Sequence, residues 1–189
     1  MNFARWKAWF SGRLPNFQQL VAVYGVIVLI LYGWTVYWYL WKLPSWLYFL
    51  TVTEMLSAFA YAMVVNFLES LLVLLVPVLL CILLPSRWFR DRFVSQATVL
   101  VVLLLASLMQ YLVSITARQD IPPGMVWAAL LTLAVIAFLV FLVGRIGFLR
   151  RAVEEIAGRA VILLYIFLPV SALSILVVLF RNIIEAWNG

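Results

Sequence analysis

Long runs without a charged residue are the feature that most constrains how this chain folds. Four of them match the length of a bilayer crossing: Phe17–Trp41, Phe93–Ala117, Met125–Val143 and Ala160–Phe180. A helix rises about 1.5 Å per residue, so it crosses the roughly 30 Å hydrocarbon core in about 20 residues. The chain is also 68% hydrophobic and 11% charged over 189 residues, which is more apolar than a soluble domain of this size can bury. The runs predict four transmembrane helices of an all-α integral membrane protein.

The stretch between Pro44 and Pro85 has room to cross the bilayer once or twice, and the basic residues decide between the two. With one crossing and a cytoplasmic N-terminus, only three basic residues lie outside: Lys42, Arg118 and Arg181. The other ten lie inside: Arg5, Lys7, Arg13, Arg87, Arg90, Arg92, Arg145, Arg150, Arg151 and Arg159. With two crossings, five lie inside and eight outside, against the positive-inside rule. We therefore predict a five-transmembrane-helix bundle whose second span covers about residues 58–84.

Three segments are predicted to lie at the membrane surface. Residues 1–15 carry Phe3, Trp6 and Phe10 at helical spacing, as in an amphipathic interfacial helix. Ser45–Ser57 is either an interfacial helix or an upward extension of the second span, since no Gly or Pro interrupts the chain from Ser45 to Val76. Residues 144–159 read as a cytoplasmic amphipathic linker with oppositely charged pairs four residues apart. Residues 1–189 then form a single membrane domain, with spans at about 17–41, 58–84, 93–117, 125–143 and 160–180.

The residues that usually carry catalysis are scarce. The sequence has no histidine and one cysteine, Cys81, which removes the common haem and zinc ligands, the usual general base and any internal disulfide. Asp91 and Asp120 both fall in predicted loops, so an aspartyl dyad within the membrane is excluded. We therefore predict no enzymatic activity, no catalytic residue, no metal site and no cofactor. The net charge of +6 follows from topology and requires no nucleic-acid partner.

Glu69 is the most informative polar residue, because a carboxylate within a membrane span is costly. Asn66 precedes it by three residues, and folding the second and third spans about the Pro85–Arg92 turn brings Gln110 to the same depth. We predict a polar intramembrane cluster of Glu69, Asn66 and Gln110. It is interpreted either as hydrogen-bonding glue between helices or as a cation, proton or substrate site. A third alternative is a shifted register that places Glu69 in the headgroup zone.

Aromatic residues crowd the outer end of the first span and the segment after it: Tyr32, Trp34, Tyr37, Trp38, Tyr39, Trp41, Trp46 and Tyr48. Such a group is typical of the aromatic belt at a membrane interface. The alternative is a platform on which a lipid headgroup or a sugar stacks.

Two functions remain open from the sequence. The first is a non-catalytic integral membrane protein that acts as an accessory or anchoring subunit of a membrane complex. The second is a small transporter or lipid-handling protein with a polar site around Glu69 in the outer leaflet. Both imply a multi-pass protein of the cell (inner or plasma) membrane, surrounded by lipid and with a protein partner or further copies of itself.

Overall fold

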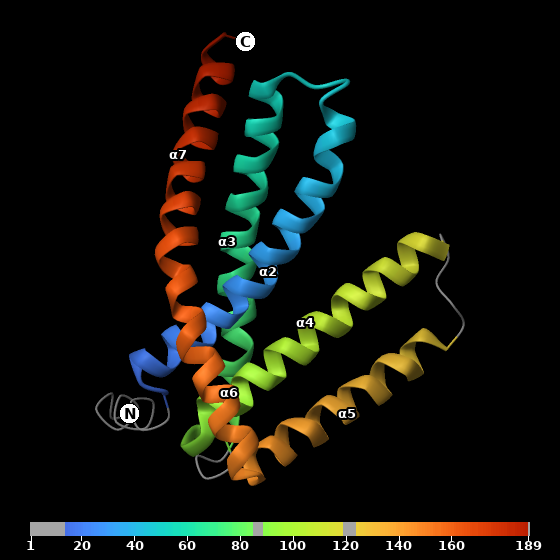
Figure 1. Cartoon of the computed structure of the whole chain (residues 1–189), viewed down its shortest axis with the longest axis vertical. Coiled ribbons are helices and arrows are strands. Elements are labelled where there is room, and N and C mark those ends of the chain that lie inside the picture. Colours follow the sequence, from blue (N-terminus) through green and yellow to red (C-terminus); the bar gives the residue numbers. More distant parts are fainter. Residues whose placement is uncertain (1–13, 85–88, 119–123, 189) are drawn as a thin grey trace, which may run out of the picture.

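The computed structural model describes residues 14–84, 89–118 and 124–188, and the regular structure in these ranges is helical throughout (Figure 1). Five helices in them are long and apolar enough to cross a membrane. The prediction of an all-α protein is therefore confirmed for the described residues, and so is the prediction of five helices with the length and composition to span a membrane. The interfacial helix predicted over residues 1–15 falls, up to residue 13, outside the described residues.

The first two long helices form a hairpin. α2 (Phe17–Trp46) begins after Asn16, whose backbone N–H donates to the Gln19 side chain at 3.0 Å. α3 (Val52–Leu83) begins after Thr51, whose N–H and hydroxyl both donate to the Glu54 carboxylate at 2.8 Å. The extension predicted as one alternative for Ser45–Ser57 holds only from Val52, where α3 starts six residues before the predicted second span. Ser45 and Trp46 end α2, and a turn over residues 47–51 separates the two helices. Helices of 30 and 32 residues are about 45 and 48 Å long, so they tilt or project beyond a hydrocarbon core of about 30 Å.

A second hairpin follows. A short 3₁₀ turn, η1 (Arg90–Arg92), leads into α4 (Phe93–Arg118), and α5 (Met125–Arg145) returns beside it. Gly124 precedes α5 with a φ of 92°, a left-handed conformation that glycine adopts at low cost. α4 packs mainly against α2 and α5. It diverges from α3 as the two helices leave the turn that joins them (Figure 1).

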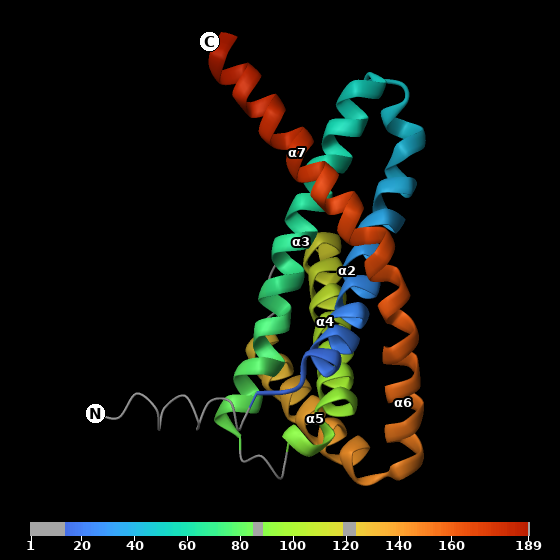
Figure 2. The same cartoon turned by 90° about the vertical axis from the view of Figure 1, so that its left-hand side faces the viewer.

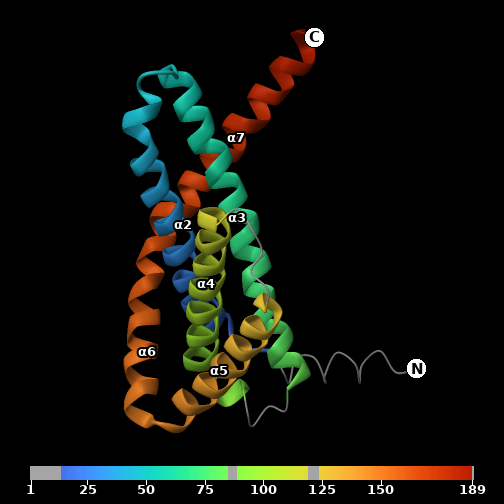
Figure 3. The same cartoon turned by 90° about the vertical axis from the view of Figure 1, so that its right-hand side faces the viewer.

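The last part of the chain is a bent rod. α6 (Gly147–Ala160) continues through the 3₁₀ turn η2 (Val161–Leu163) into α7 (Leu164–Asn188), as Figures 2 and 3 show from two sides. The predicted linker over residues 144–159 is helical, but α6 packs against α2 and α4 rather than lying apart from the bundle. Its small residues explain this, because Ala157 and Ala160 are buried against Val26 of α2 and small side chains let helices approach closely.

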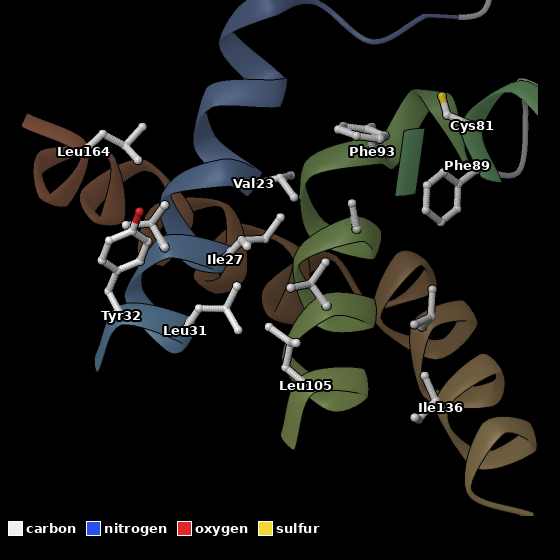
Figure 4. Close-up of a cluster of buried hydrophobic side chains, with 14 of the residues drawn as sticks. Val23, Ile27, Leu31, Tyr32, Cys81, Phe89, Phe93, Leu105, Ile136 and Leu164 are labelled. Carbon is white, nitrogen blue, oxygen red and sulfur yellow. The ribbon is translucent and has the colours of Figure 1, made fainter. Parts of the chain in front are cut away.

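α2 is the central helix of the fold. It packs against α3, α4, α6 and α7, and its buried Val23, Ile27 and Leu31 meet side chains of the other helices in the core shown in Figure 4. Phe93 and Leu105 reach this core from α4, and Ile136 and Leu164 from α5 and α7: the core thus joins both hairpins to the bent rod.

Candidate functional site

Asn66 lies in the interface between α2 and α3. Its side chain is 4% exposed, and its Oδ1 accepts a hydrogen bond from the Thr35 hydroxyl at 2.9 Å. The Nδ2 atom of Asn66 is buried without a hydrogen-bond partner in the part of the chain that the structure describes. One turn further along α3, the buried Ser70 pairs with the Tyr24 hydroxyl at 3.0 Å. This side of α3 is a polar strip inside the protein.

Glu69 sits beside that strip but faces out of the bundle. Its side chain is exposed, and among the described residues its carboxyl group makes neither a hydrogen bond nor an ion pair. Its neighbours on the same side of α3 are bulky and apolar: Val65, Leu68 and Leu72 are 49%, 55% and 64% exposed. The described residues of this chain therefore leave the one carboxylate in the middle of α3 uncovered.

Gln110 faces outward from a different helix. It is exposed on α4, and its side chain has no hydrogen bond within the described ranges. Because α4 diverges from α3 (Figure 1), the structure does not bring the three predicted residues together. Asn66 lies with Thr35 and Ser70, whereas Glu69 and Gln110 each face outward. Counting residues from the turn between two helices predicts the depth of a side chain in the membrane. It does not predict the direction in which that side chain points from its helix axis.

Tyr32 is not part of the aromatic belt predicted at the end of the first span. It is 1% exposed, its hydroxyl lies 2.6 Å from that of Ser171 on α7, and its ring centroid is 4.8 Å from that of Phe167. Sequence reasoning missed Tyr24 altogether. The signal was present, since Tyr24 and Thr35 are 11 residues apart and so return to the same side of α2 after three helical turns.

The other aromatic residues of this region fall into two groups. Trp34, Tyr37 and Trp38 contact one another with ring centroids 5.8 to 6.5 Å apart, and all three are exposed. Tyr39 instead packs edge-on against Trp46 and Phe59 and donates its hydroxyl to the Met55 carbonyl at 3.1 Å. The first group has the composition of an interfacial belt, while the second closes the top of the α2–α3 hairpin.

The opposite end of the bundle is basic. This basic end comprises the arginines of the α3–α4 turn and the α5–α6 junction: Arg90, Arg92, Arg145, Arg150 and Arg151. Arg92 donates to the Gly144 carbonyl, and the buried Gln96 amide packs directly against Gly144, where a Cβ would collide with it. Arg145 lies 4.9 Å above the Phe141 ring. These contacts join the start of α4 to the end of α5.

Grooves run between the described helices, among them the following two. One, of about 470 Å³, lies between α2, α4 and α6; another, of about 400 Å³, lies between the start of α3 and the middle of α7. Thr53, Ser57 and Ser174 contribute polar groups to the second groove, whereas Thr98 is the polar residue of the first. The described residues include no cluster of three or more His, Cys, Asp or Glu side chains with which a metal could be held.

In comparisons with known proteins, no family model, curated protein or solved structure matches the chain. The case for a function therefore depends on the geometry described above.

Proposed function

We propose that this chain is a non-catalytic integral membrane protein that serves as an accessory or anchoring subunit of a membrane complex. The observation that carries the proposal is the exposure of Glu69 in the middle of a membrane-spanning helix. Glu69 stands 17 residues after Val52 and 14 before Leu83, so about 25 and 21 Å of helix separate it from the two ends.

A bare carboxylate at that position is costly. Ionised side chains near the centre of a span cost about 2.5 kcal/mol or more, and such residues almost always face a protein interior or a water-filled cavity. Among the described residues Glu69 faces neither a protein interior nor a cavity, because its surroundings on α3 are exposed leucine and valine side chains. A second polypeptide that packs on this side of α3 and offers a hydrogen-bond donor removes the cost.

The residues around Glu69 suit helix packing. The exposed stripe of α3 consists of Val65, Leu68, Glu69, Leu72, Leu75 and Leu79. Its apolar members alternate at spacings of three and four residues, which is the pattern by which one helix packs along another. A partner helix packed along this stripe would cover the carboxyl group of Glu69, which lies at the edge of the stripe.

We further propose that the basic end faces the cytoplasm of a plasma membrane. The basic end carries five arginines, while Lys42 and Arg181 lie toward the other end of the bundle. An excess of arginine on the cytoplasmic side is the usual bias of multi-pass proteins, and it agrees with the sequence-based orientation with a cytoplasmic N-terminus.

The proposal is tested by purifying the chain from its native membrane in a polymer disc and recording native mass spectra. We expect a stoichiometric protein partner, and we expect Glu69→Leu to lose that partner several-fold more readily, because one intramembrane hydrogen bond contributes about 0.6 to 2 kcal/mol. Glu155→Gln, which removes an exposed carboxylate paired with Arg159 on α6, is the charge-matched control and should keep the partner. A chain without any protein partner would refute the subunit role and favour the transporter or lipid-handling alternative.

A further inference from the structure

The groove between α2, α4 and α6 has a composition that suits a hydrocarbon chain. Val26 and Ile30 form its α2 wall, Thr98 and Val102 belong to its α4 wall, and Val153 and Ile156 form its α6 wall. Apart from Thr98, whose hydroxyl is buried, its lining residues are apolar. Its volume of about 470 Å³ lies within the roughly 300–1,000 Å³ of typical ligand sites.

Water is a poor occupant of such a groove. A water molecule needs two to four polar partners to be held in place, and the only polar atom of the lining, the Thr98 hydroxyl, is covered. The groove is bordered by membrane-spanning helices, so the molecules next to it are lipids. An acyl chain fills it without leaving a polar group unpaired.

The charges of α6 set the level of the groove in the bilayer. α6 carries Arg150, Arg151, Glu154, Glu155 and Arg159 within 14 residues, and this density of charge belongs at the headgroup level rather than in the hydrocarbon core. Since Val153 and Ile156 of the same helix form one wall, the groove begins at the headgroup level. A ligand that lies in it should have a polar head at the α6 side and an apolar chain along α2 and α4.

Arg150 stands where that head would lie. It precedes Val153 by three residues and so shares its side of α6. Its Nε is buried without a hydrogen bond in the described ranges, and the nearest carboxylate oxygen, of Glu154, is 3.6 Å away. Both side chains of this pair are 41% exposed, and such surface pairs are weak. The guanidinium group therefore keeps donors for a phosphate, which arginine binds well.

We propose that this groove is a binding site for one anionic glycerophospholipid, with an acyl chain between α2, α4 and α6 and its phosphate on Arg150. The site is independent of the protein partner proposed above, because it lies on α6 and α4 rather than on the exposed stripe of α3.

The test is a native mass spectrum of the purified chain after it is mixed with phosphatidylglycerol and phosphatidylcholine of identical acyl chains. We expect the wild type to retain one phosphatidylglycerol in preference to phosphatidylcholine. Arg150→Gln should lower that preference about fivefold, since a basic residue near the membrane surface contributes about 1 kcal/mol toward an anionic lipid. Val153→Trp, which fills the groove, should lose both lipids.

Leu133→Trp is the matched control, because Leu133 is 53% exposed on α5 and does not line the groove; it should retain lipid as the wild type does. Equal retention of the two lipids by the wild type would overturn the proposal, as would unchanged retention in Val153→Trp. Should Val153→Trp fail to fold, the Arg150→Gln comparison still decides, because an unaltered lipid preference contradicts the site. A chain that keeps the lipid but has no protein partner would uphold this site while refuting the subunit role.

Discussion

At the scale of single residues, hydrogen bonds between two side chains join α2 to its neighbours at three places in the described part of the chain. Tyr24 pairs with Ser70, Thr35 with Asn66, and Tyr32 with Ser171 of α7. Hydrogen bonds between membrane helices contribute about 0.6 kcal/mol on average, so these contacts select the rotation of each helix more than they add stability. They account for the polar residues of α2 that face the interior and leave Glu69 as the one carboxylate on α3 without a role inside the chain.

Gly25 is the residue whose substitution should be most disruptive in α2. A Cβ at this position would lie 2.9 Å from the Ala160 carbonyl carbon and the Val161 nitrogen, which are backbone atoms and cannot move aside. We predict that Gly25→Ala lowers the free energy of unfolding by about 1 to 3 kcal/mol, the usual cost of overpacking, measured by thermal unfolding in detergent.

Gly33 of the same helix provides the control. A Cβ there meets no atom within 4 Å, and alanine favours a helix interior over glycine by about 1 kcal/mol. Gly33→Ala should therefore leave stability unchanged or raise it. Equal effects of the two substitutions would show that α2 and the α6–α7 junction are not as close as the structure has them.

The sequence identified the residue types of the candidate site better than their arrangement. Asn66 and Glu69 differ by three positions, yet one is buried and bonded to Thr35 while the other is exposed. Charge and hydropathy indicate that a residue lies within a membrane span. Whether its side chain faces the protein interior or the outside depends on which other helices pack against that span. Leucine and valine occur both on the buried side of α3 and in its exposed stripe, so the apolar residues alone do not distinguish the two sides.

At the scale of helices, the sequence was sufficient to predict how many helices are long and apolar enough to span a membrane. It was insufficient to predict the residues at which those helices begin and end. α3 is a single helix of 32 residues, as the charge count favoured, because a second crossing needs a turn that no Gly or Pro supplies before Pro77. α6 was harder to foresee. Its alternation of charged and apolar residues resembles that of a surface helix, and only the close approach at Gly25 and Ala160 places it against α2.

The direction of each helix through the membrane is testable with reporter fusions. Reporters placed after Arg118, at the end of α4, and after Arg151, near the start of α6, should read outside and inside respectively, since arginines gather at the basic end. An enzymatic reporter that is active only in the cytoplasm and one that is active only outside provide the paired measurement. Reversed signals would overturn both the cytoplasmic basic end and the single crossing of α3.

At the scale of the whole molecule, the two hairpins make unequal contacts. The α2–α3 hairpin and α7 pack along one another, whereas α5 rests mainly on α4 and α6. The tilted α4–α5 hairpin leaves the exposed stripe of α3 accessible along much of its length (Figure 1). Sequence alone did not predict this asymmetry, because it arises from long-range packing of small residues on α2 and α6 rather than from any local pattern.

If a second polypeptide covers the exposed stripe of α3, photo-crosslinking in the native membrane will capture it. A photoreactive amino acid would replace Leu72, one turn from Glu69 and 64% exposed, and in a separate variant Leu133 of α5, 53% exposed. We expect a protein adduct of defined mass from position 72 and lipid adducts alone from position 133. Lipid adducts alone from both positions would contradict this expectation, because α3 would then face the bilayer with its carboxylate uncovered.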